Sequence, residues 1–164
     1  MKYPAKDLLT HLKSQIGAMH SFTTQDPLAS ATFRQYFEAI GDFNPVYFDT
    51  EIAESIGFES LIAPPTLICE SEQFSGTVEE NTPFSQRTFL NGHWYNWLRA
   101  GNNYEFYNSA KVGDVISTKK TFEDVWLKKG ENGTHIFKKI NIYYRNQSGE
   151  TLAKNEEIMF VTLA

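Results

Sequence analysis

The hydrophobic pattern of this chain changes its period near Phe89, and this change constrains the fold more than any other feature. Before it, apolar residues recur at the spacing of amphipathic helices. After it, aromatic and β-branched residues occur in segments that are typical of strands. The expected strands span residues 97–107, 114–127, 134–145 and 151–163. Glycine-containing turns separate them, so the sequence predicts helices followed by an antiparallel meander, which is an α+β fold with the helices on one side of the sheet.

The N-terminal half is expected to hold several short helices and one strand. Ser30 and Thr50 are the predicted N-caps of the second and third helices, and Gly41 and Gly57 are expected to end these helices. The polar residues 75–86 predict a loop, with a mobile flap as an alternative. The predicted helices span residues 7–16, 31–40, 51–56 and 67–74, and the predicted strand spans residues 20–24.

The composition indicates one globular domain, residues 1–164, in which residues 1–19 form a helical extension. Hydrophobic residues make up 41% of the chain and charged residues 21%, which argues against intrinsic disorder. The single cysteine, Cys69, allows no internal disulfide, and the four histidines lack ligand spacing, so we expect no metal and a cytoplasmic location. The net charge of −5 disfavours nucleic acid, and no apolar run reaches membrane-spanning length.

A short loop between the second and third helices concentrates groups that can do acid–base chemistry. It reads Gly-Asp-Phe-Asn-Pro-Val-Tyr-Phe-Asp, and its polar side chains are Asp42, Asn44, Tyr47 and Asp49. Three of these also have structural interpretations: Asp42 as a helix-ending cap, Asn44 as a loop brace, and Asp49 as a carboxylate that stabilises a helix N-terminus. Tyr47 is expected either to hold a water molecule or to form a wall between core and pocket.

Residues 39–49 resemble the signature of the MaoC-like hydratases and dehydratases. Three further blocks resemble the same family, residues 57–66, 111–116 and 144–150, so that the resemblance covers roughly residues 20–163. The family implies a hotdog fold, in which an antiparallel sheet wraps round one long central helix. It also implies hydration of an enoyl thioester, or the reverse loss of water from a 3-hydroxyacyl thioester. Coenzyme A or acyl carrier protein is then the substrate carrier, and no cofactor is needed.

In this family an Asp and a His hold one water molecule and move its protons, while a backbone amide at the start of the central helix binds the thioester oxygen. Asp42 matches the catalytic Asp and Asn44 the family's Asn, but Tyr47 stands where the His is expected. A phenol donates a proton well and accepts one poorly near neutral pH. Pro65 is the second departure, because it stands at a Gly position and has no N–H to offer; the N–H of Thr66 is the alternative donor.

Other parts of the chain supply further candidates. His93 is a candidate to replace the missing imidazole, although a histidine among aromatic residues is more often packed or on the surface. Asn102 and Asn103 are expected to contact the thioester or to solvate a strand edge. Trp94 and Trp97 are expected to line an acyl tunnel or a dimer interface.

Two further features have mainly structural interpretations. Cys69 is expected to be a small buried hydrophobic residue, because no basic residue near it in the sequence would activate its thiol. Three lysine pairs, at 119–120, 128–129 and 138–139, are expected on solvated strand faces or at a hairpin tip. The alternative interpretation of these pairs is a patch for the phosphates of a carrier such as coenzyme A.

Tyr47 and the Pro64-Pro65 pair together resemble the FAS1-like dehydratase branch, in which such a hotdog often pairs with a second hotdog that keeps the Asp–His dyad. We therefore expect a subunit of an enoyl-CoA hydratase or 3-hydroxyacyl dehydratase, which forms the acyl pocket and depends on a catalytic partner in a heterodimer. One alternative is a self-sufficient homodimeric hydratase that uses Asp42, with Tyr47 or His93 as helper. The other is a non-enzymatic acyl-CoA-binding module.

Overall fold

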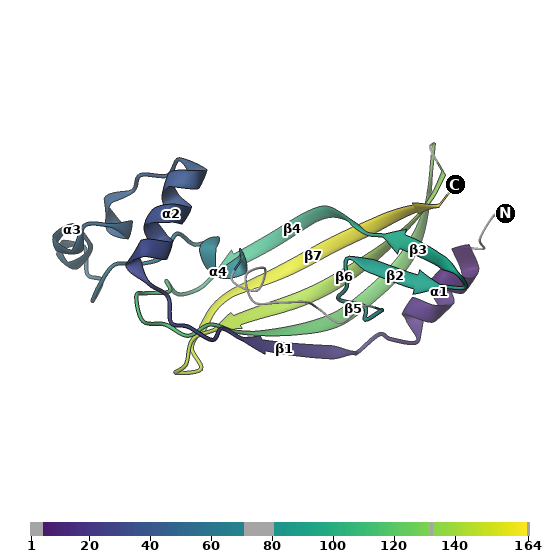
Figure 1. Cartoon of the computed structure of the whole chain (residues 1–164), viewed down its shortest axis with the longest axis horizontal. Coiled ribbons are helices and arrows are strands. Elements are labelled where there is room, and N and C mark those ends of the chain that lie inside the picture. Colours follow the sequence, from purple (N-terminus) through teal and green to yellow (C-terminus); the bar gives the residue numbers. More distant parts are fainter. Residues whose placement is uncertain (1–4, 71–80, 132, 164) are drawn as a thin grey trace.

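The computed structural model describes residues 5–70, 81–131 and 133–163. Helices α2 and α3 project beyond one end of the sheet, whereas α1 and the β2–β3 hairpin lie towards the other end (Figure 1). The helices are α1 (Ala5–Lys13), α2 (Ser30–Ile40), the 3₁₀ turn η1 (Pro45–Tyr47), α3 (Thr50–Ser55) and α4 (Leu67–Glu70). The strands are β1 (Met19–Thr23), β2 (Arg87–Leu90), β3 (His93–Asn96), β4 (Leu98–Phe106), β5 (Ser117–Gly130), β6 (Gly133–Arg145) and β7 (Thr151–Leu163).

Five strands form one antiparallel sheet in the order β1-β5-β6-β7-β4. The sequence predicts a meander of four strands, but only β5, β6 and β7 are consecutive neighbours in the sheet. The first of the four, β4, pairs with β7 instead of β5 and forms one edge, and β1 pairs with β5 at the other edge. Ile140 and Ile142 of β6 are buried, whereas the following residue, Tyr143, is exposed. This is the predicted alternation between a covered face and a wetter face of the sheet. The predicted α+β plan is therefore confirmed.

The β2–β3 hairpin is a separate two-stranded sheet that the hydrophobic pattern did not predict. Its turn is Asn91-Gly92, and both residues have positive φ, 52° and 79°. Positive φ at both central residues is the type I′ geometry that Asn-Gly favours, since this turn matches the right-handed twist of the flanking strands. The Asn-Gly dipeptide was therefore the signal that could have found the hairpin.

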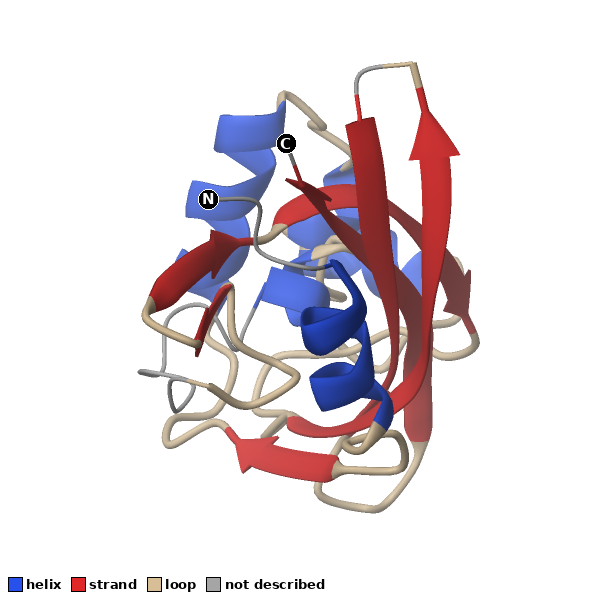
Figure 2. Cartoon of the chain, turned by 90° about the vertical axis from the view of Figure 1, so that its right-hand side faces the viewer, coloured by secondary structure: helices blue, strands red, loops and turns tan. Residues whose placement is uncertain are grey.

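The main core lies on the concave side of the sheet. Leu8 and Leu12 of α1 are fully buried in it, against strand residues such as Ile136 and Ile140. Figure 2 shows α1 inside the curve of the strands. The helix predicted as an N-terminal extension therefore contributes to the core.

Two predicted helix caps are wrong by one residue. The N-cap of α2 is Ala29, which makes no side-chain cap hydrogen bond, and Ser30 is the first helical residue. The N-cap of α3 is Asp49 rather than Thr50, because Asp49 Oδ1 accepts a hydrogen bond from the N–H of Ile52 at 3.1 Å. The predicted role of Asp49 at a helix N-terminus is confirmed by this contact.

The predicted helix 67–74 is described only over its first turn, as α4. Its remaining residues, 71–74, and the first part of the predicted loop, 75–80, lie outside the described residues. Residues 81–86 form turns and bends, in agreement with the loop prediction. In the part of the chain that the structure describes, no helix is both long enough and apolar enough to cross a membrane.

One lysine that was predicted on a solvated strand face is instead fully buried. Lys138 points into the core because the strand register places it opposite the buried Met159. Its ammonium donates to the carbonyls of Pro83 and Ser85, at 2.9 and 2.8 Å, and lies 4.3 Å from the centre of the Trp97 ring. These contacts replace water around the charge. Burial nevertheless lowers the pKa of Lys138 to about 7.

Candidate functional site

The loop between α2 and α3 begins with a glycine that ends the helix. Gly41 has a left-handed conformation, with φ of 71°, and the following N–H, of Asp42, donates to the carbonyl of Phe37 at 3.1 Å. This backbone arrangement closes the helix C-terminus. The side chain of Asp42 is therefore not required as the cap, and its carboxylate has a different partner.

The carboxylate of Asp42 accepts a hydrogen bond from the phenol of Tyr47, with 3.1 Å between Tyr47 Oη and Asp42 Oδ2. Tyr47 is only 6% exposed, whereas Asp42 is exposed. Burial, together with the hydrogen bond to Asp42 and its charge, raises the pKa of Tyr47 above its ordinary value. Tyr47 therefore stays protonated at neutral pH, and it orients the carboxylate as a hydrogen-bond donor.

A small apolar cluster, separate from the main core, holds Tyr47 in place. It consists of Phe37, Val46 and Tyr47, with Ile62 packed against them. The rings of Phe37 and Tyr47 stack with 6.4 Å between their centres. Asn44 caps the 3₁₀ turn η1, because its Oδ1 accepts a hydrogen bond from the N–H of Val46 at 3.3 Å. This contact is the bracing role predicted for Asn44.

The loop lies against the segment that leads into α4. The N–H of Ile62 donates to the carbonyl of Val46 at 3.3 Å. The phenol of Tyr36, on α2, donates to Thr66 Oγ1 at 2.9 Å and so ties α2 to the start of α4. The structure therefore brings together the two sequence blocks that carry the predicted catalytic groups and the Pro-Pro departure.

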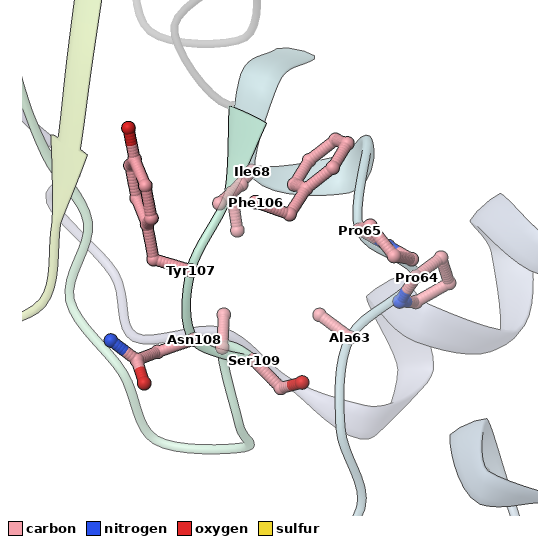
Figure 3. Close-up of a pocket in the computed structure, with 9 residues that line it drawn as sticks. Ala63, Pro64, Pro65, Ile68, Phe106, Tyr107, Asn108 and Ser109 are labelled. Atoms are coloured by element: carbon pink, nitrogen blue, oxygen red, sulfur yellow. The ribbon is translucent and has the colours of Figure 1, made fainter. Parts of the chain in front are cut away.

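A pocket of about 200 Å³ lies beside Pro65. Figure 3 shows Ala63 and the two proline rings on one side of it, and Phe106, Asn108 and Ser109 on the other. A hydrogen bond from the N–H of Ala63 to the carbonyl of Ala110, at 2.7 Å, joins the two sides. The described lining residues are Ala63, Pro64, Pro65, Ile68 and residues 106–110.

Pro65 lines this pocket, whereas the opposite wall of the pocket is not predicted by the sequence. This wall consists of Phe106, the last residue of strand β4, and of residues 107–110, which follow the strand. The aromatic pair Phe106-Tyr107 before a turn is the only sequence signal at this place. Neither Asp42 nor Tyr47 is among the described residues that line this pocket. The carboxylate of Asp42 is therefore not part of the described pocket wall, although the backbone of its loop contacts Ile62, which precedes the lining residue Ala63.

The other predicted residues lie farther away. His93 and Trp94 belong to the β2–β3 hairpin, towards the end of the sheet opposite α2 and α3 (Figure 1), so the single chain does not bring His93 next to Asp42. Trp97 is buried in the core, where its indole N–H donates to Thr88 Oγ1 at 2.9 Å. Trp94 is 40% exposed and available for contact with another molecule.

The two predicted asparagines lie on the edge strand β4. Asn102 and Asn103 are both exposed, and as neighbours along a strand they face opposite sides of the sheet. The amide of Asn155, on the neighbouring strand β7, donates to Asn102 Oδ1 at 3.0 Å. Neither Asn102 nor Asn103 is among the described residues that line the pocket beside Pro65.

Cys69 follows the pocket wall on α4 and packs against the main core. Burial raises the pKa of its thiol to about 12, so the thiol is almost entirely protonated at neutral pH and is a poor nucleophile. Cys69 is partly rather than fully buried, and its packing against the core agrees with the predicted structural role. Among the described residues, no group of three or more His, Cys, Asp or Glu side chains could hold a metal ion.

Comparison with known proteins finds a matching family model and several relatives of this chain. The family model for the FAS1-like, dehydratase domain region matches residues 14–155. The chain is 30% identical over 141 residues to a probable enoyl-CoA hydratase alpha subunit of Thermomonospora curvata, a match that covers 79% of this chain and 43% of the relative. The chain therefore matches less than half the length of that relative.

Solved structures confirm the expected hotdog fold. One similar chain comes from the ChsH1-ChsH2 complex of Mycobacterium tuberculosis, with a TM-score of 0.78, 16% identity and coverage of 98% of both chains. Another is the MaoC-like dehydratase of Rhodospirillum rubrum, with a TM-score of 0.63, 18% identity and coverage of 91% of this chain and 93% of that one. At these identities the likeness is one of fold.

Proposed function

The chain belongs to the FAS1-like dehydratase family, and from this premise we propose that it is the pocket-forming subunit of a MaoC-like hydratase or dehydratase. Its substrate is an enoyl or 3-hydroxyacyl thioester carried by coenzyme A or by an acyl carrier protein. The Asp–His pair that moves the protons of water comes from a second hotdog subunit. The present chain contributes a wall of the acyl pocket and one side of the interface between the two subunits.

The state of Tyr47 is the observation that carries this proposal. A general base for water must accept a proton near neutral pH, as an imidazole does. Tyr47 stands in the imidazole's place, but its phenol is buried, has a raised pKa and already donates to Asp42. In the part of the chain that the structure describes, the exposed Asp42 has an oriented carboxylate and no imidazole partner.

The pocket beside Pro65 supports the same division of labour. Pro65 offers no N–H at the position where the family's oxyanion donor is expected, and loss of one such donor typically lowers the rate about 10²–10³-fold. The pocket's volume of about 200 Å³ is below the ~300–1,000 Å³ of pockets that enclose a whole ligand. A second subunit would enlarge it and supply the missing donor.

The names of two relatives support a heteromeric assembly. The relative from Thermomonospora curvata is named an alpha subunit, and the chain with a TM-score of 0.78 comes from a two-component complex. Hotdog sheets commonly associate about a two-fold axis, so a dimer is the expected form. We propose that the partner here is a different hotdog chain with an intact Asp–His pair.

Hydration of crotonyl-CoA and of longer enoyl-CoAs by the purified chain tests this proposal. We expect no turnover above background for the chain alone, and turnover when a hotdog subunit with an Asp–His pair is added. Robust hydration by the lone chain, abolished in Asp42→Ala, would show instead a self-sufficient hydratase. Tight binding of acyl-CoA without turnover in the presence of any such subunit would show a binding module.

A further inference from the structure

A second hollow, of about 370 Å³, lies over strands β1, β5 and β6, which are neighbours in the sheet (Figure 1). Its volume falls in the ~300–1,000 Å³ range of small-molecule sites. Its described lining contains two cations, several hydroxyl groups and a phenol, but no carboxylate. The side chains that carry these groups include Ser21, Thr23, Ser117, Lys119, Tyr143 and Arg145.

The strand register places the polar groups on one face of the sheet. Ser21 pairs with Lys119, which in turn pairs with Tyr143. Ser117 pairs with Arg145 two residues farther along. Residues two apart on a strand share a face, so Lys119 and Arg145 are diagonal neighbours on it. Diagonal neighbours across antiparallel strands lie about 7–8 Å apart, within the reach of long side chains. The two cations can therefore contact a single anion between them.

These two cations differ from others on the same sheet. Lys139 and Lys154 form ion pairs with Glu156, at 3.4 and 3.3 Å, and Lys154 also pairs with Glu105 at 3.3 Å. Over the described ranges of the chain, neither Lys119 nor Arg145 forms an ion pair. Two unneutralised cations at this separation repel each other, and an anion bound between them would remove that repulsion.

We propose that this hollow binds the phosphate group of a small phosphorylated ligand. Arg145 supplies the planar guanidinium that contacts two phosphate oxygens at once, and Lys119 supplies a point charge. The hydroxyl of Ser21 is a neighbouring donor, whereas that of Ser117 donates to the backbone carbonyl of Arg145 at 3.4 Å. The ring of Tyr143, 39% exposed beside Lys119, is a surface for the apolar or aromatic part of the ligand. The inference does not depend on which subunit moves protons, because it concerns binding alone.

Isothermal titration calorimetry of the full chain at low salt tests this site. The ligands are adenosine 3′,5′-bisphosphate, 4′-phosphopantetheine and inorganic phosphate, with pantetheine as the control that lacks phosphate. We expect saturable binding of at least one phosphate-bearing ligand, about tenfold weaker or more in Arg145→Ala and in Lys119→Ala. Binding should also weaken with added salt. Lys128→Ala, which removes an exposed lysine outside this lining on the same strand, should bind as the wild type does.

The pattern across the ligands identifies the source of the phosphate. Preference for the bisphosphate indicates a nucleotide, preference for phosphopantetheine indicates the arm of a thioester carrier, and equal binding of all three indicates free phosphate. Unchanged thermal midpoints establish that the variants are folded. The proposal is wrong if no phosphate-bearing ligand saturates at millimolar concentration, if pantetheine binds equally well, or if the two alanine variants bind as tightly as the wild type.

Discussion

The buried lysine of the core gives a prediction for stability as a function of pH. Lys138 is fully buried, and burial lowers its pKa from the ordinary 10.5 to about 7. Between these two values the unfolded chain binds the proton and the folded chain does not. The free energy of unfolding therefore rises with pH across this window, because the unfolded state binds more protons. Replacement by Met keeps the unbranched apolar stem, one atom shorter than lysine, and removes the charge.

The size of the effect follows from the two pKa values. Within the window each pH unit changes the free energy of unfolding by about 1.4 kcal/mol for one group. With the folded pKa at about 7, the contribution of Lys138 should grow by about 2 kcal/mol between pH 7 and pH 9. Below the folded pKa both states are protonated, and the contribution becomes independent of pH. The nearby Glu157 raises the pKa of Lys138 and Lys120 lowers it, but burial is the largest cause.

Urea unfolding at several pH values between 6 and 9 measures this difference. We expect the wild type to gain about 2 kcal/mol relative to Lys138→Met between pH 7 and pH 9. Lys139→Met is the matched control, because Lys139 lies on the other face of the strand and pairs with Glu156; its curve should lack this divergence. Parallel curves for wild type and Lys138→Met across the range would refute a buried lysine with a lowered pKa.

Three further experiments, two with variants and one with a thiol reagent, test residues in and near the candidate site. Asp49→Ala removes the N-cap of α3 and should cost about 1 kcal/mol in urea unfolding, whereas Asp49→Ser should restore most of it; equal losses would contradict a capping role. Cys69 should react slowly with a thiol reagent at pH 8 and rapidly in denaturant, since burial raises its pKa to about 12; fast labelling of the folded chain would contradict this. Tyr47→Phe removes the hydrogen bond to Asp42 and should cost about 1 kcal/mol of stability, and no loss would show that this contact is not formed in solution.

The long strands could be predicted because their side chains alternate over many residues. In β6, for example, Ile140 and Ile142 point inward and Tyr143 points outward, so the sequence period alone indicates a long strand. The β2–β3 hairpin was missed because each of its strands has only four residues, too few for a period to be recognised. Its Asn91-Gly92 turn was the stronger signal.

The buried position of Lys138 could not be found from composition, since a lysine pair normally marks a solvated face. Its environment depends on the carbonyls of Pro83 and Ser85, which are more than fifty residues away in the chain. The loop residues, including Asn44 as a brace, could be identified from the sequence, but the direct hydrogen bond between Tyr47 and Asp42 and the backbone partner of Asn44 required coordinates. The pocket wall after β4 is likewise a product of tertiary contact.

The turnover number of the reconstituted complex tests most directly whether this chain shapes the pocket without moving protons. Asp42→Asn keeps an acceptor for the phenol of Tyr47 and removes the basic carboxylate. With a hotdog subunit that carries an Asp–His pair, the account predicts that kcat for crotonyl-CoA hydration stays within a few-fold of the wild type. A loss of about 10²–10⁴, the usual contribution of a general acid–base group, would contradict it.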